Sequence, residues 1–125
     1  MVVIGIALTA AGLIGFISNP IVSSDPGAVF RVNMAHDLVH IVTGLLALGI
    51  ALGTRGLALA NATIGFGVIY TVVFVLCLID PTLFGLFGDA PVNSGDHVLH
   101  AATALVSLGL GFVLRQETLE AGAPR

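Results

Sequence analysis

Residues 56–79 read GLALANATIGFGVIYTVVFVLCLI, a run without a charged side chain that exceeds the about 20 residues a helix needs to cross a bilayer. Three further charge-free runs follow or precede it, at residues 1–24, 38–54 and 98–114. The last two are shorter, and they span a bilayer only if the preceding turn, which carries His and Asp, lies at the membrane boundary. A soluble bundle would show a polar face on each helix, whereas these runs are apolar all round. The pattern predicts four membrane-spanning helices.

The composition agrees with a membrane environment. Of the 125 residues, 57% are hydrophobic and 9% are charged, against about 25% charged in a typical soluble domain. The length predicts one domain, residues 1–125. Four Arg, no Lys and a net charge of −3 argue against a nucleic-acid partner, because phosphates require a basic face. The single cysteine, Cys77, permits no intrachain disulfide. We therefore predict an all-α integral membrane protein with the lipid bilayer as its first partner.

The arginines predict an orientation. With four spans both termini lie on one side of the membrane, together with Arg55, Arg115 and Arg125, while the longer loops contain only Arg31. Cytoplasmic loops carry the excess of basic residues. We expect a multi-pass protein of the cell membrane with both termini in the cytoplasm.

An internal repeat relates the starts of the second and fourth predicted helices. Residues 33–43, NMAHDLVHIVT, realign with residues 93–103, NSGDHVLHAAT. The chain is therefore predicted to be a four-helix bundle of two duplicated transmembrane hairpins, about residues 1–55 and 56–115. A parallel repeat brings the two helix starts to the same depth. Asn33 and Asn93 are good N-caps, because their side-chain oxygens can accept from free backbone N–H groups.

All four histidines of the chain lie in this repeat, at spacings that place each pair on one helix face. Polar side chains in membrane helices usually face the bundle, and neutral imidazole binds borderline metals such as zinc, copper or iron. Asp96 takes the repeat position equivalent to His36. We predict four metal ligands, with two secondary candidates beside them: His36, His40, Asp96 and His100, then Asp37 and His97.

Other roles for these residues stay open at this point. The same His and Asp side chains could form a hydrogen-bonded lock between the two halves, without a ligand. His40 and His100 could instead supply two axial ligands to haem, although helices with short apolar parts leave little depth for that group. A proton or transport path is a further reading, but the third run offers few midplane polar groups. Neither a nucleophile with its base nor a phosphate-binding loop is recognisable, which favours a protein that is not an enzyme.

The chain resembles a family of small bacterial and archaeal membrane proteins classed as a domain of unknown function, number 4383. The likeness is strongest at residues 32–40, VNMAHDLVH, and at residues 91–100, PVNSGDHVLH. The matching positions are His36, His40, Asp96 and His100, whereas the positions of Asp37 and His97 commonly hold Asn in the family. The resemblance implies a four-span bundle with a polar motif on its outer face, and no activity. We expect a membrane protein that binds a metal or cofactor, or an accessory subunit of a larger complex or homo-oligomer.

Overall fold

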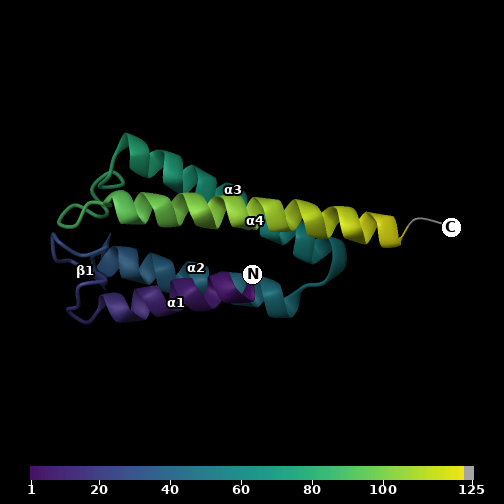
Figure 1. Ribbon diagram of the computed structural model, residues 1–125, viewed down its shortest axis with the longest axis horizontal. Helices are drawn as coiled ribbons and strands as arrows, with labels where there is room; N and C mark the ends of the chain where they lie inside the picture. Colours follow the sequence, from purple (N-terminus) through teal and green to yellow (C-terminus); the bar gives the residue numbers. More distant parts are fainter. Residues whose placement is uncertain (123–125) are drawn as a thin grey trace.

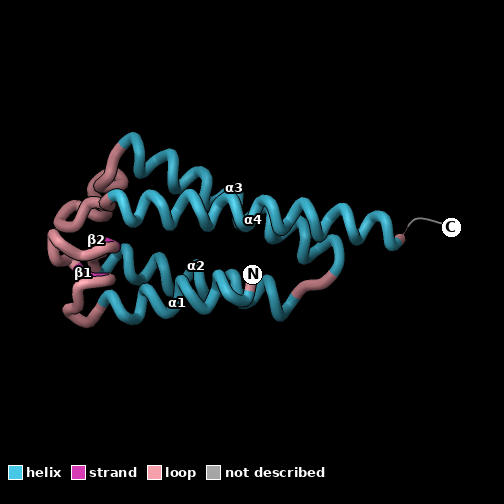
Figure 2. Tube along the Cα trace, in the orientation of Figure 1, coloured by secondary structure: helices cyan, strands magenta, loops and turns pink. Residues whose placement is uncertain are grey.

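The computed structural model describes residues 1–122 as helices joined by turns and one short two-stranded ribbon (Figures 1 and 2). In chain order the elements are α1 (Val2–Gly15), β1 (Val22–Ser23), β2 (Phe30–Arg31), α2 (Met34–Gly53), α3 (Gly56–Ile79) and α4 (Ser94–Ala121). The two strands pair in parallel, with Val22 opposite Phe30 and Ser23 opposite Arg31. Helix α1 packs against α2, and α3 packs against α4. The result is an all-α bundle made of two helical hairpins; their origin by duplication stays a prediction.

Both longer loops gather at one end of the bundle. The α1–α2 loop (residues 16–33) and the α3–α4 loop (residues 80–93) lie together at the left of Figure 1, where α2 and α4 both begin. At the opposite end the two hairpins are joined by the short turn between α2 and α3, where Gly56 adopts a φ of +56° that favours glycine. The starts of α2 and α4, with their histidines, therefore share one end of the molecule.

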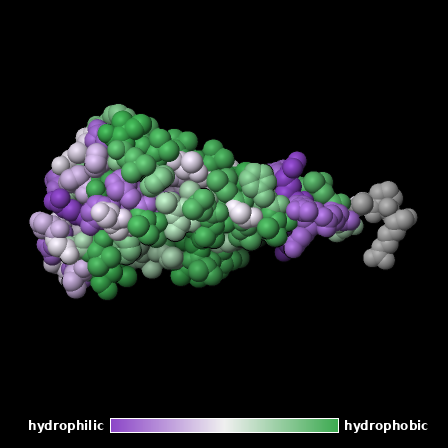
Figure 3. All heavy atoms as spheres, turned by 45° about the horizontal axis from the view of Figure 1, so that its top comes forward, coloured by the Kyte–Doolittle hydropathy of each residue, from purple (hydrophilic) through white to green (hydrophobic). Residues whose placement is uncertain are grey.

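The surface of the bundle is apolar along its middle, and the interior holds polar side chains. Figure 3 shows hydrophobic residues covering the middle of the visible face, with hydrophilic residues gathered towards the two ends. Helices α2, α3 and α4 are each long and apolar enough to cross a membrane. The interior contains apolar side chains such as Leu8 and Phe66, together with small residues and polar ones, among them His36, Thr63, Asp96, His100 and Ser107. Membrane helices associate in this way, because lipid solvates large apolar side chains while small and polar residues pack between helices.

Glycine lets the helices of each hairpin approach closely. A Cβ on Gly44 of α2 would lie 2.6 Å from the backbone nitrogen of Thr9 on α1. A Cβ on Gly111 of α4 would lie 2.8 Å from the backbone nitrogen of Ile64 on α3. Neither position has room for a side chain, so glycine is required for both backbone contacts.

Helix α3 coincides with the charge-free run at residues 56–79, but α1 is shorter than the run that predicts it. The apolar run extends to Ser24, whereas α1 ends at Gly15. The side-chain amide of Asn19 donates to the backbone oxygens of Ile14 and Ile17 and accepts from the nitrogens of Ile21 and Val22. These bonds replace helical ones, and Pro20 disfavours helix at the residue before it. The prediction of four membrane-spanning helices is therefore confirmed for α2, α3 and α4 but not for α1, whose 14 residues form a shorter apolar helix.

Candidate functional site

The two helices that carry the histidines each have an asparagine as N-cap. Asn33 is the N-cap of α2, and its side chain accepts from the backbone nitrogen of His36 at 3.0 Å. Asn93 is the N-cap of α4 and accepts from the nitrogen of Asp96 at 3.1 Å. The Asp96 carboxylate accepts in return from the nitrogen of Asn93 at 2.9 Å, which completes a capping box. Both caps stand at the positions that the sequence predicts for them.

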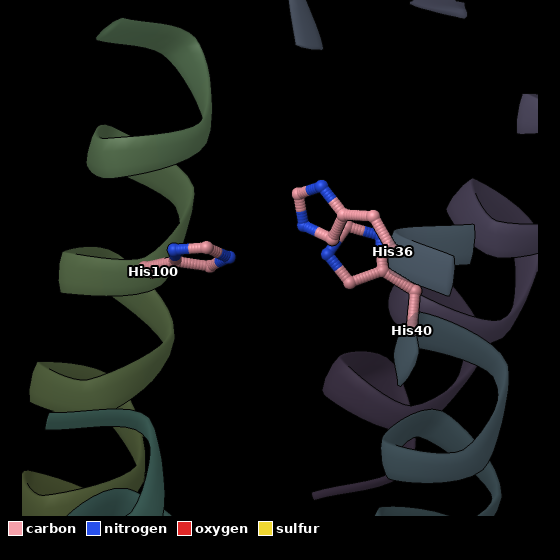
Figure 4. A group of neighbouring side chains, drawn as sticks. All are labelled: His36, His40 and His100. Atoms are coloured by element: carbon pink, nitrogen blue, oxygen red, sulfur yellow. The ribbon is translucent and has the colours of Figure 1, made fainter. Parts of the chain in front are cut away.

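Three of the four predicted ligands converge inside the bundle, next to these helix starts. His36 and His40 lie one turn apart on α2, and His100 reaches towards them from α4 (Figure 4). One ring nitrogen from each of the three lies within 4.8 Å of the others. The ring centroids of His36 and His40 are 4.4 Å apart, and those of His36 and His100 are 5.7 Å apart. The group therefore lies between the two hairpins.

The three imidazoles are buried, and most of their ring nitrogens lack a hydrogen-bond partner within residues 1–122. Their relative exposure is 1% for His36, 1% for His40 and 2% for His100. Within residues 1–122, both ring nitrogens of His36 and of His40, and Nδ1 of His100, have no hydrogen-bond partner. A neutral imidazole has one N–H donor and one acceptor lone pair, and burying either without a partner costs about 1–3 kcal/mol. Five such atoms in one place are unusual in a folded protein.

Aromatic residues enclose the group. Phe87, from the α3–α4 loop, stacks on His36 with a centroid distance of 4.4 Å and an interplanar angle of 19°. Tyr70, on α3, lies 6.2 Å from His100 between centroids, and its hydroxyl is 2.8 Å from Oγ1 of Thr43. Sequence reasoning did not assign Phe87 or Tyr70 to the site. Tyr70 was visible as a polar residue in the third run, whereas Phe87 lies in an irregular loop without a periodic pattern.

A small cavity adjoins the three histidines. Its volume is about 50 Å³, and it is lined by side chains of α2, α3, α4 and the α3–α4 loop. Apart from the histidines, the polar side chains in its wall are those of Thr43 and Tyr70. A water molecule requires about 10–15 Å³ of such space, so the cavity can hold a group of about three non-hydrogen atoms.

Asp96 lies outside the group of three. Its carboxylate is buried, and its Oδ2 accepts from the backbone nitrogens of Arg31 and Asn93, at 3.1 and 2.9 Å. The nitrogen of Arg31 belongs to the other hairpin, so Asp96 ties the α1–α2 loop to the start of α4. Its Oδ1 is buried and has no hydrogen-bond partner within residues 1–122, and the ligand role of Asp96 stays a prediction.

The two secondary candidates also lie apart from the histidine group. Asp37 is buried with its carboxylate against Gly15 of α1, where a Cβ could not fit. His97 packs edge-on against Phe74 of α3, with centroids 6.3 Å apart. Neither belongs to the group whose ligand atoms approach one another within residues 1–122.

Hydrogen bonds between the two loops hold the end of the bundle together. The Asn33 side chain donates to Oδ1 of Asp89 at 2.6 Å, and the Asn93 side chain donates to the backbone oxygen of Ala28 at 3.0 Å. The bond from Asn33 lowers the pKa of Asp89, with a smaller contribution from the nearby charge of Arg31. These side-chain hydrogen bonds between the hairpins are therefore made by Asn and Asp side chains and not by the histidine rings.

Comparison of the sequence with known protein families gives one match. A family model described as a domain of unknown function (DUF4383) matches residues 1–113. Neither a curated protein nor a solved structure matches the chain.

Proposed function

The chain belongs to the family described as a domain of unknown function, DUF4383, and since that description assigns no activity, we propose from the site itself that this membrane protein binds a transition metal ion through His36, His40 and His100. The observation that carries the proposal is the convergence of three buried imidazoles whose nitrogens lack protein partners. A metal ion satisfies the acceptor lone pair of each ring at once. Three imidazole ligands suit zinc, copper or iron.

The geometry requires little adjustment to hold an ion. Zinc–nitrogen bonds of about 2.0–2.1 Å in tetrahedral geometry place the ligand nitrogens about 3.4 Å apart. The nitrogens of the group lie within 4.8 Å of one another, so the rings need to close by at most about 1.4 Å. His36 and His40 share a helix face, and a small rotation of each side chain supplies this movement.

We propose the orientation that the arginines predict. We place Arg55 and Arg115 on the cytoplasmic side of the cell membrane, where basic residues are in excess. The metal site then lies near the outer surface, beneath the two longer loops. In this position it meets metal ions from outside the cytoplasm.

Metal analysis of the detergent-purified protein tests the proposal. After equilibration with zinc, copper or iron and removal of free ions, we expect about one bound ion per chain in the wild type. His40→Ala and His100→Ala should each abolish metal binding, because each variant keeps only two of the three imidazole ligands, too few to hold the ion. His97→Ala is the matched control, since His97 lies on the same helix as His100 but outside the group. Absence of any bound metal above background, or equal loss in the control, overturns the proposal.

A structural lock remains the second candidate function, and the bonds of Asp96 and Asn33 between the hairpins favour it. The two functions differ in how chelation affects stability. If the histidines bind metal, a chelator should destabilise the wild type and leave His100→Ala unchanged. If they only pack, His100→Ala should be less stable than the wild type by the same amount with and without chelator.

A further inference from the structure

The histidine group offers three protein ligands, and the cavity beside it has room for a further one. Structural zinc sites are closed by four protein ligands, whereas sites that bind a water or substrate keep one of four positions free. The group of ligand atoms within residues 1–122 contains His36, His40 and His100 and no fourth His, Cys, Asp or Glu. Asp96, the predicted fourth, uses Oδ2 for two backbone N–H groups; its Oδ1 has no partner within residues 1–122, but Asp96 does not belong to this group. The coordination of an ion is thus incomplete without a ligand from outside the chain.

The cavity lies where this ligand would be needed. All three histidines line it, together with residues of α3 such as Tyr70 and Val73. Its volume of about 50 Å³ accommodates a group of about three to five non-hydrogen atoms. Most of the wall is apolar, so a bound group is held mainly by the ion and by the few polar atoms present.

Tyr70 supplies an acceptor for such a group. The Thr43 hydroxyl donates its single hydrogen to the backbone oxygen of Val39 at 2.7 Å, as threonines in helices commonly do. The 2.8 Å contact between Thr43 and Tyr70 is therefore a bond in which the tyrosine hydroxyl donates. The phenolic oxygen keeps a free lone pair. A water molecule in the cavity can donate a hydrogen bond to that lone pair while its own oxygen faces the ion.

We infer that the His36–His40–His100 centre is an open one, with a coordination position that holds water and exchanges it for anions or neutral molecules of about three non-hydrogen atoms. This inference rests on the proposed metal binding. An open centre acts as a Lewis acid: it polarises the small molecule that it binds and lowers the pKa of bound water. The small volume of the cavity favours small molecules.

Cobalt(II) provides the test, because its visible spectrum reports a change of ligand directly. The detergent-purified protein is loaded with one cobalt ion and titrated with sodium azide, which has three non-hydrogen atoms. We expect a saturable shift of the visible bands with azide, and a weaker response to imidazole, which is larger, with five non-hydrogen atoms. Val73→Phe fills the cavity wall and should weaken azide binding at least tenfold. Val72→Phe is the control, since Val72 is exposed on α3 and does not line the cavity.

Each outcome has one meaning. A cobalt spectrum that azide leaves unchanged in the wild type overturns the open centre and leaves metal binding intact. Lack of any cobalt spectrum before azide is added overturns both proposals. Equal azide affinity in Val73→Phe and Val72→Phe overturns the cavity as the binding place. Should Val73→Phe fail to bind cobalt, Val73→Leu adds one methylene at the same wall and is expected to weaken azide binding by a smaller factor.

Discussion

Phe87 provides a direct test of how the α3–α4 loop supports the histidine group. The Phe87 ring is 1% exposed, stacks on His36, and packs with Cys77 and Val92 beneath the loop. Phe84, three residues earlier in the same loop, is 71% exposed. The two positions therefore form a matched pair that differs in burial.

Burial sets the expected magnitudes. Phe87→Ala removes a fully buried ring, and such changes cost about 3–5 kcal/mol of unfolding free energy. Phe84→Ala should change the unfolding free energy by no more than about 0.5 kcal/mol, because the side chain makes few contacts. Phe87→Leu keeps most of the volume and should cost less than about 1.5 kcal/mol. It nevertheless removes the stacking on His36, which is worth about 0.5–1.5 kcal/mol.

Two assays separate the effects on stability and on metal affinity. Unfolding by titration with sodium dodecyl sulfate, followed by circular dichroism, measures the free energies of the three variants against the wild type. Competition with a coloured chelator measures zinc affinity, and Phe87→Leu should lower it about twofold to twelvefold if the lost stacking energy appears in binding. Equal stability of Phe87→Ala and Phe84→Ala would refute the assigned packing. Wild-type zinc affinity in Phe87→Leu would show that the stacked ring does not position His36.

Two further predictions concern the helix packing and the two longer loops. Gly111→Ala should destabilise the α3–α4 hairpin by about 1–3 kcal/mol, because its Cβ would lie 2.6 Å from Cγ1 of Ile64. Gly109→Ala, with open space around it, should have no such cost in the same unfolding titration. The pKa of Asp89 is lowered by the bond from Asn33, so this carboxylate contributes stability that is present above its ordinary value of 3.8 and is lost as pH falls through the lower folded value. Asp89→Asn should therefore flatten the acid side of the melting-temperature profile, and a profile unchanged below pH 3.8 would contradict this role.

Much of the architecture was predictable because one physical cause dominates it. Lipid excludes charge, so the charge-free run at residues 56–79 coincides with α3. The N-caps were predictable for a different reason. Asn33 and Asn93 stand shortly before the apolar runs, and an Asn side-chain oxygen can accept from the free backbone N–H groups of a helix start. The end of α1 was not, because the bonds from Asn19 involve residues on both sides of it and no charge marks the place.

The site was predictable in part. The repeat pattern placed His36, His40 and His100 on facing helices, and the structure brings them together. Asp96 was assigned to the same group because the repeat equates it with His36. In the structure its Oδ2 accepts from the backbone N–H groups of Asn93 and Arg31, and Asp96 lies outside the group of three histidines. The spacing of Asn93 and Asp96 is that of a capping box and was the available signal for this role.

Phe87 illustrates what sequence patterns omit. Its place beside His36 depends on how the α3–α4 loop folds, and irregular loops have no period from which a facing residue can be read. Leu83 and Phe84 of this loop adopt left-handed backbone conformations, which these residue types rarely adopt and which the sequence therefore does not predict. Residues contributed by such loops become visible only in three dimensions.

The division of the histidines between two hairpins has a consequence for biosynthesis. Ribosomes deliver the chain from its N-terminus, so α2 enters the bilayer with two imidazoles before α4 has been made. Membrane helices insert first and associate afterwards, and His100 can join the others only after this second stage. If the three rings bind an ion as proposed, that ion can be held by all of them only after α4 has been inserted and has packed against α2.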